Sequence, residues 1–231
     1  MYERQLRENL PRVRDAIGRA AHRVGRGEGE VTLVAVTKAH PPDAIRAALT
    51  EGIRDLGENR LEELEEKVGI LGRDAATWHM VGHLQSRKAA RAVTLMDLLH
   101  SVDTMKLARR LSTFAEQEGF RLPALVQVNL SGEEAKAGFG AEEVAEAVHQ
   151  MVELPGLEVR GFMTMAPFVE DEKVLRAVFS RLRRIQEEAV KLPGCDGREL
   201  SMGMTNDFEL AVEEGSTMVR IGTALFGERR R

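Results

Sequence analysis

The chain has 231 residues, of which 43% are hydrophobic, so it can bury a sizeable core. Its net charge of -4 provides no global basic field for nucleic acid, and no uninterrupted apolar stretch approaches the length of a membrane span. The single cysteine, Cys195, excludes an internal disulfide and fits a reducing compartment. We therefore expect one cytoplasmic domain over residues 1–231, with neither nucleic acid nor a membrane as its partner.

The first predicted element is an amphipathic helix at the N-terminus. It mixes acids with arginines and lacks the apolar core of a signal peptide. Its apolar residues recur at steps of three and four, so they share one face that packs against the rest of the chain. This face consists of Leu6, Leu10, Val13, Ile17, Ala21 and Val24.

Extended apolar runs alternate with helical segments along the remaining chain. Eight runs are predicted to be strands: Val31–Lys38, Ile53–Asn59, Trp78–His83, Leu98–Asp103, Ala124–Leu130, Leu157–Met165, Glu199–Met204 and Met218–Phe226. Seven segments between them have helical spacing or helix-start residues: Pro42–Glu51, Arg60–Val68, Ser86–Met96, Thr104–Glu118, Glu142–Glu153, Glu172–Leu192 and Asn206–Glu214.

Eight consecutive β-then-α units predict an α/β fold, a single (β/α)8 TIM barrel with an additional N-terminal helix. Only a few residues follow the eighth strand, so no eighth crossover helix is expected there. The N-terminal helix is predicted to fill that gap.

Polar residues gather at the ends of the predicted strands, and the carboxyl ends of barrel strands line one mouth. Lys38 ends the first run, where partial desolvation favours the nucleophilic free amine; the alternative is a lysine that simply extends to water. Each of the other strand-end residues could alone be an ordinary turn or capping residue. They are Asn59, His83, Asp103, Asn129, Ser201, Arg220, Gly222 and Thr223.

The last two strands carry a predicted anion site, because barrels often bind phosphate with the loops after strands 7 and 8. Gly222 lets backbone N–H groups approach an anion, and the hydroxyls of Ser201 and Thr223 can donate to phosphate oxygens. Together with Lys38, this pattern describes a ligand with an aldehyde at one end and a phosphate at the other.

Six motifs in order resemble one known family, that of the pyridoxal phosphate homeostasis proteins, over nearly the whole chain. The resemblance implies a barrel like the N-terminal domain of alanine racemase, with pyridoxal 5′-phosphate (PLP) held as a Schiff base on Lys38. The motifs are Val34–Lys38, Gly57–Asn59, Trp78–Ser86, Gly161–Met165, Leu200–Thr205 and Val219–Thr223.

The resemblance also implies roles for individual residues. Ser201, Gly222 and Thr223 correspond to phosphate ligands, and Arg220 to the residue that faces the pyridine nitrogen. A permanently cationic guanidinium there favours the unprotonated ring and restrains carbanion chemistry. Asn59 is expected near the lysine, where it could orient the ring. Lys136 could meet the cofactor in transit, although a solvated loop lysine is the simpler interpretation.

These observations favour a PLP carrier over an enzyme. The only tyrosine, Tyr2, is near the chain start, so a two-base racemase lacks its second base. We assign no catalytic residue and no metal ligand, since His79, His83, His100 and Asp103 show no metal-binding spacing. The expected role is intracellular PLP (vitamin B6) homeostasis, with PLP-dependent apoenzymes as candidate recipients and a monomeric state.

Two enzymatic alternatives remain open at this point. One is a PLP-dependent amino-acid racemase or lyase that uses a single base, with His79 or His83 as a proton donor. The other is a Schiff-base aldolase on a phosphorylated sugar, which would use the same lysine and phosphate site without a cofactor.

Overall fold

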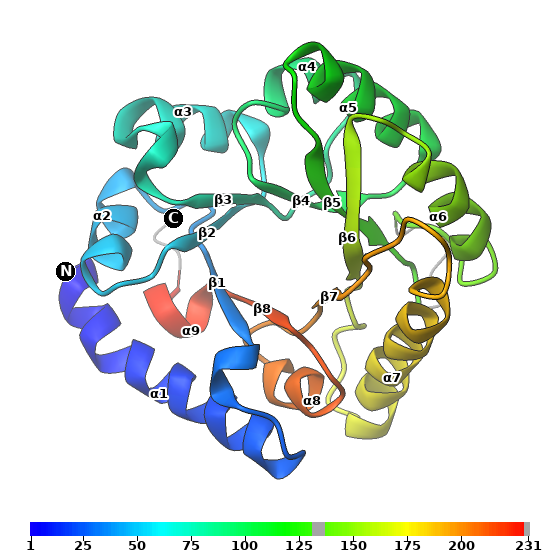
Figure 1. The fold of residues 1–231 in the computed structure, drawn as a ribbon. Coiled ribbons are helices and arrows are strands. Elements are labelled where there is room, and N and C mark those ends of the chain that lie inside the picture. Colours follow the sequence, from blue (N-terminus) through cyan, green and yellow to red (C-terminus); the bar gives the residue numbers. More distant parts are fainter. Residues whose placement is uncertain (131–136, 229–231) are drawn as a thin grey trace.

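The computed structural model describes residues 1–130 and 137–228. Eight parallel strands close into one barrel in chain order, and helices surround it (Figure 1). The strands are β1 (Thr32–Val36), β2 (Asp55–Glu58), β3 (Thr77–Met80), β4 (Leu98–Val102), β5 (Leu122–Gln127), β6 (Leu157–Met163), β7 (Glu199–Ser201) and β8 (Met218–Ile221). Pairing of β1 with β8, with Ala35 opposite Ile221, closes the barrel and confirms the predicted fold class.

The helices follow the predicted alternation. They are α1 (Tyr2–Arg23), α2 (Pro42–Thr50), α3 (Leu61–Leu71), α4 (Ala89–Ala92), α5 (Met105–Gln117), α6 (Val144–Val152), α7 (Glu172–Ala189), α8 (Phe208–Glu213) and α9 (Thr223–Phe226). Thr104 caps α5 by accepting a hydrogen bond from the N–H of Leu107 at 3.2 Å, as its residue type predicts.

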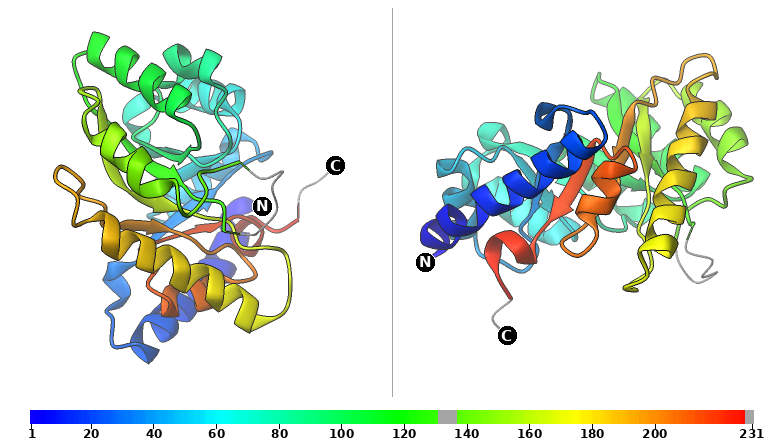
Figure 2. Two further views of the ribbon diagram at one scale, coloured as in Figure 1. Left: turned by 90° about the vertical axis from the view of Figure 1, so that its right-hand side faces the viewer. Right: turned by 90° about the horizontal axis from the view of Figure 1, so that it is seen from below.

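Helix α1 lies beside α2, α8 and α9 and covers the barrel where a crossover helix after β8 would otherwise lie (Figure 2). Leu6, Leu10, Val13, Ile17 and Ala21 are buried on its inner face. The prediction for the helix is therefore confirmed, except that Val24 lies beyond its end and is 44% exposed.

Several predicted elements are wrong in extent. The predicted third and seventh strands, Trp78–His83 and Glu199–Met204, end early, at Met80 and Ser201. The predicted eighth strand to Phe226 ends at Ile221, because the N–H groups of Leu225 and Phe226 bond back to the carbonyl of Gly222 and form α9. The predicted helix Ser86–Met96 contains only one α-helical turn, α4. The carbonyl of Thr94 accepts from Arg73 at 3.1 Å, so this end of the segment is tied to the loop before β3.

The core has an outer and an inner part. The outer part lies between the barrel and the helices and contains most of the buried apolar side chains. The inner apolar cluster is small, and polar side chains occupy part of the barrel interior, including His79, His100, Ser201 and Arg220. The inner cluster consists of Val34, Val36, Val81, Leu98, Leu125, Met163 and Met218.

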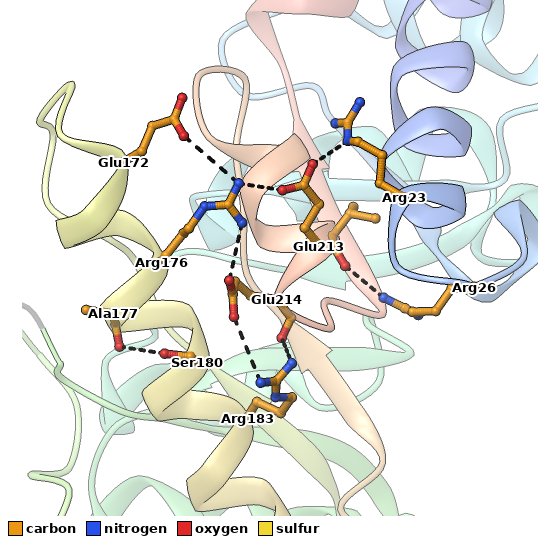
Figure 3. A network of polar contacts seen from close by, with 10 residues as sticks. Arg23, Arg26, Glu172, Arg176, Ala177, Ser180, Arg183, Glu213 and Glu214 are labelled. Carbon is orange, nitrogen blue, oxygen red and sulfur yellow. Dashed lines mark hydrogen bonds and ion pairs between the residues drawn. The ribbon is translucent and has the colours of Figure 1, made fainter.

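An ion-pair network on the outside of the barrel joins α8 to two neighbouring helices (Figure 3). Glu213 accepts from Arg23 of α1 at 2.5 Å and from Arg176 of α7 at 2.5 Å. Arg176 also donates to Glu214 at 3.3 Å. The Glu213 side chain is only 12% exposed, so these pairs are less screened by solvent than ordinary surface pairs.

Replacing Glu213 with Gln is expected to lower the free energy of unfolding by about 1 kcal/mol at neutral pH. Burial opposes ionisation of Glu213, but Arg176 and Arg23 outweigh it and lower the pKa of Glu213 below its ordinary value. The stabilisation is therefore complete above the ordinary glutamate pKa of 4.5 and is lost as the pH falls through the lowered value. Urea titrations between pH 7 and pH 3 should show a difference between the two proteins that is full at pH 7 and shrinks as the pH is lowered. Glu209→Gln, at a more exposed partner of Arg23, should have a smaller effect.

Cys195 is buried, and its thiol is expected to react slowly. Burial, with a smaller contribution from the charge of Asp196, raises the pKa of Cys195 to about 11 from 9.0. Because the thiolate is the reactive form, a thiol reagent at pH 8 should modify the folded protein at least about a hundredfold more slowly than the urea-unfolded chain. Equal rates in the two states would contradict this expectation.

Within residues 1–130 and 137–228, no helix combines the length and the apolar character that crossing a bilayer requires.

Candidate cofactor site

A cavity of about 320 Å³ opens where the predicted site residues meet. Its wall includes the segments that follow β1, β2 and β8, and it is completed by the loops after β6 and β7. Five of the six predicted cofactor-binding residues line it: Lys38, Asn59, Arg220, Gly222 and Thr223. Segments far apart in the sequence thus bring a lysine, an asparagine, an arginine and a threonine to one cavity.

Ser201, the sixth predicted residue, does not line this cavity. Its side chain is fully buried inside the barrel, where its hydroxyl accepts from Arg220 Nη1 at 2.5 Å and contacts His100 Nδ1 at 2.8 Å. The hydroxyl is thus engaged below the cavity and does not face it. The structure instead brings Thr205, four residues later, to the cavity wall.

Charged side chains hydrogen-bond to the residues on either side of Lys38 and stabilise its turn. Lys67 donates to the carbonyl of Thr37 at 2.8 Å, and the Thr37 hydroxyl donates to Glu58 in a short hydrogen bond. On the other side of Lys38, the N–H of Ala39 donates to Glu63 at 2.7 Å. Ala39 adopts a left-handed φ of 60°, which an alanine takes only at a cost that surrounding contacts must offset. These contacts fix the backbone on both sides of the half-buried lysine.

Glu58 and Lys67 form a buried ion pair at 2.6 Å, with side chains 0% and 4% exposed. Burial raises the pKa of Glu58 above its ordinary value, while the charge and hydrogen bond of Lys67 act in the opposite direction. Glu58 Oε2 has no hydrogen-bond partner among the described residues. The ionised form of Glu58 therefore depends on Lys67.

Arg220 lies at the floor of the cavity and is 5% exposed. Nη1 donates to the carbonyl of Ser201 at 2.7 Å as well as to its hydroxyl, and Nη2 donates to the carbonyl of Thr164 at 3.0 Å. Burial lowers the pKa of Arg220 to about 10, with the Asp207 carboxylate acting in the opposite direction. The guanidinium therefore remains cationic at neutral pH. Together with Lys38, it favours an anionic ligand.

The loop after β7 folds tightly against the end of β8. Gly203 has a φ of +94°, and a Cβ there would lie 2.6 Å from the Cβ of Ala211, so this position requires glycine. Its carbonyl accepts from the N–H of Arg220 at 3.0 Å. Asp207 closes the next turn by accepting from the N–H of Met204 at 2.6 Å. This turn presents Thr205 beside Thr223 in the cavity wall.

Asn59 is positioned by a close backbone approach. A Cβ on Gly82 would lie 2.1 Å from the carbonyl oxygen of Asn59, so only glycine allows the segment after β3 to pass this closely. The glycine of the motif Val81-Gly82-His83 therefore helps to place the Asn59 backbone at the cavity.

The remaining predicted strand-end residues lie outside the cavity. His83 and Asp103 contact each other at 2.7 Å, and His83 is largely exposed. Asn129 follows β5, where its N–H donates to the carbonyl of Phe139 at 2.9 Å. Lys136 lies outside the described residues. Thr205, which also lines the cavity, was not predicted as a site residue, although it follows the end of a barrel strand and the Gly203 turn.

Comparison with known proteins first defines the protein family to which this chain belongs. The alanine racemase N-terminal domain family matches residues 5–230. A pyridoxal phosphate homeostasis protein of Aquifex aeolicus is 38% identical over 223 residues, which cover 96% of this chain and 98% of that protein. This chain belongs to the pyridoxal phosphate homeostasis protein family, as its motifs predict.

Solved structures agree with this assignment. A protein from Bifidobacterium adolescentis described as unknown has a TM-score of 0.91 and 38% identity, with 97% of this chain and 96% of that chain covered. PipY of Synechococcus elongatus PCC7942, solved with PLP bound, has a TM-score of 0.81 and 38% identity, with 92% of this chain and 99% of that chain covered.

Proposed function

We propose that this chain binds PLP in the cavity beside Lys38 and takes part in intracellular PLP homeostasis. The observation that carries the proposal is the convergence of Lys38, Thr205, Arg220 and Thr223 on one cavity. A PLP-bound relative of 38% identity supports the choice of ligand. The residues fit the group, because a cavity of about 320 Å³ with an amine and a cationic floor suits a small anionic aldehyde.

Lys38 is the proposed attachment point. Its amine would condense with the aldehyde carbon of PLP to form a Schiff base, with loss of one water molecule. When bound, PLP supplies a reactive aldehyde that this bond holds reversibly. The contacts of Thr37 and Ala39 with Lys67 and Glu63 keep the turn in place, so the amine is presented at a fixed position.

The phosphate end is assigned to the segments after β7 and β8. Gly222 and Thr223 begin the short helix α9, and barrels often bind phosphate at these loops and at the start of such a helix. Thr205 adds a hydroxyl from the neighbouring loop. Thr205, Gly222 and Thr223 are therefore the proposed phosphate ligands. Asn59 is the proposed partner for the ring or its hydroxyl.

A carrier role is favoured over amino-acid turnover. Tyr2 lies away from the cavity, with its hydroxyl 3.3 Å from His40 Nδ1. Both ring nitrogens of His79 are in hydrogen-bond contact, one with Asp55 and the other with His100. Neither nitrogen therefore faces the ligand. Arg220, which we place at the pyridine nitrogen, would restrain carbanion chemistry because it remains charged.

The binding proposal is tested by adding PLP to the purified protein and removing the excess by gel filtration. One equivalent of PLP retained per chain, with a changed visible absorption spectrum, is the expected result. A panel of amino acids should then show turnover well below about 1 per second, and ordinary enzyme rates would establish the racemase or lyase alternative instead.

Homeostasis requires release as well as binding, and PLP-dependent apoenzymes are the proposed recipients. Transfer from the loaded protein to an apoenzyme is measured with and without a free-aldehyde scavenger. Transfer that persists with scavenger indicates direct hand-over, and transfer that stops indicates storage and release into solution. A cytoplasmic location and a monomeric state remain predictions.

A further inference from the structure

A continuous chain of side-chain contacts crosses the barrel interior and ends at Arg220. It begins with Asp55 at the start of β2, continues through His79 of β3 and His100 of β4, and crosses to Ser201 of β7 and Arg220 of β8. The contact distances are 3.1 Å for Asp55 Oδ1 to His79 Nε2, 2.9 Å for His79 Nδ1 to His100 Nε2, 2.8 Å for His100 Nδ1 to Ser201 Oγ, and 2.5 Å for Ser201 Oγ to Arg220 Nη1.

The donors and acceptors at its two ends fix the direction in which the hydrogen bonds of this series run. Arg220 has only donors and the Asp55 carboxylate only acceptors. The Ser201 hydroxyl therefore accepts a hydrogen bond from Arg220 and donates one to His100 Nδ1. This leaves the His100 proton on Nε2, which donates to His79 Nδ1, and the His79 proton on Nε2, which donates to Asp55.

The opposite direction is less favourable. It requires a doubly protonated His79 that donates to His100, and a His100 proton on Nδ1 that donates to Ser201. The Ser201 hydroxyl would then receive two donors, and none of its contacts among the described residues could accept its own hydrogen. A buried donor without an acceptor is costly.

Burial makes the directed arrangement strict. His79, His100 and Ser201 are 2%, 0% and 0% exposed, so water cannot substitute easily for a lost partner. Burial, with smaller contributions from His79 and Arg220, lowers the pKa of His100 well below its ordinary value, so its ring is neutral and carries one proton. The Asp55 side chain is 33% exposed and lies at the opposite end of the interior from the cavity, where strand β2 begins.

We propose that Asp55, His79, His100 and Ser201 are positioning residues that hold the guanidinium of Arg220 at the cavity floor through one directed chain of hydrogen bonds. This inference rests on the proposed function, because the ligand whose ring Arg220 faces is PLP. The chain gives Ser201 a role below the ligand, where its hydroxyl connects Arg220 to the two histidines. It also makes PLP binding sensitive to Asp55, a residue that does not line the cavity.

The first test is independent of the ligand. Nitrogen NMR of ¹⁵N-histidine-labelled, PLP-free protein, assigned with His79→Phe and His100→Phe variants, reports which ring nitrogen carries the proton. The expected result at pH 7 is a neutral ring protonated at Nε2 for both His79 and His100. A His100 proton on Nδ1 would overturn the proposal, whether or not the protein binds PLP.

The second test compares the PLP affinity of matched variants whose folding is checked by circular dichroism. Ser201→Ala should weaken binding about tenfold, the loss typical of one hydrogen bond to a charged group. Ser112→Ala removes another buried hydroxyl, which accepts from the N–H of Gly156 at 3.0 Å between α5 and the start of β6, and should change the affinity less than about twofold.

Asp55, at the end of the hydrogen-bond series far from the cavity, allows a test by rescue of PLP affinity. Asp55→Ala removes the final acceptor and should weaken PLP binding severalfold, whereas Asp55→Asn keeps an acceptor oxygen and should bind nearly as the unsubstituted protein does. Equal affinities for Asp55→Ala and Asp55→Asn, or for Ser201→Ala and Ser112→Ala, would overturn the proposal. If the unsubstituted protein retains no PLP, the proposed function fails, and the NMR result still decides whether the directed chain exists.

Discussion

Replacing Lys38 with Ala is expected to abolish covalent attachment of PLP and the absorption band that accompanies it. No other lysine among the described residues lines the cavity, so the aldehyde would have no amine to condense with there. Noncovalent binding should persist at reduced affinity, because Arg220, Thr205 and Thr223 remain. The measurement is a visible absorption spectrum of gel-filtered protein after incubation with PLP.

Lys191→Ala is the matched control for this prediction. Lys191 lies just beyond α7, is 65% exposed and pairs only with Glu188 among the described residues, at 2.7 Å. Its variant should keep the full absorption band. A band of unchanged intensity in Lys38→Ala would contradict the assignment of the attachment point.

Replacing Lys67 with Met is expected to destabilise the fold by about 3–5 kcal/mol, the range for a buried charge that loses its partner. Glu58 would remain behind the Lys38 turn with neither of its oxygens paired to a cation. The carbonyl of Thr37 would also lose its donor. Urea denaturation at pH 7 measures the change in the free energy of unfolding.

The pH dependence of this variant has a definite sign. Burial already raises the pKa of Glu58, and loss of Lys67 removes the main opposing influence, so the pKa should rise further. A carboxyl with a raised folded-state pKa contributes its stability below its unfolded pKa and loses it as the pH rises through the folded value. Lys67→Met should therefore be least destabilised near pH 4 and most destabilised near pH 8.

The double variant Glu58→Leu with Lys67→Met is the control. Removal of both charges leaves no unpaired ion, so most of the lost stability should return, although the Thr37 contacts stay absent. A double variant as unstable as Lys67→Met at every pH would contradict the electrostatic explanation.

Much of the fold could be predicted because local patterns and global topology agree. Parallel barrel strands are buried on both faces, so continuous apolar runs such as Val31–Val36 mark them clearly. Their ends were less predictable. The segment Gly222–Phe226 continues the apolar run of β8, and its turn into α9 depends on hydrogen bonds to the Gly222 carbonyl, for which the run of apolar letters gives no signal.

The site could be predicted to the level of strand ends but not to the direction of each side chain. That Lys38, Asn59 and Arg220 line one cavity could be predicted because the barrel topology brings strand ends together. Ser201 is the instructive exception. It is the last residue of β7, and its side chain points into the barrel interior, whereas Thr205 in the following loop lines the cavity. The sequence pattern of a three-residue strand and the loop after it does not show which of the two side chains faces the cavity.

The buried polar contacts could not be predicted at all. His79 and His100 lie in apolar strands, and nothing in their spacing reveals that they meet across neighbouring strands or that Ser201 connects them to Arg220. Likewise, the Glu58–Lys67 pair joins β2 to α3, whose sequence is rich in charged residues and gives no sign that Lys67 is buried.

Covalent attachment of PLP to Lys38 is measured most directly by borohydride reduction of the PLP-treated protein, followed by proteolysis and mass spectrometry. Reduction converts a Schiff base into a stable secondary amine, so the label stays on the residue that formed it. We expect one pyridoxyl phosphate group per chain, on the peptide that contains Lys38. A label distributed over surface lysines, or absent from Lys38, would contradict it.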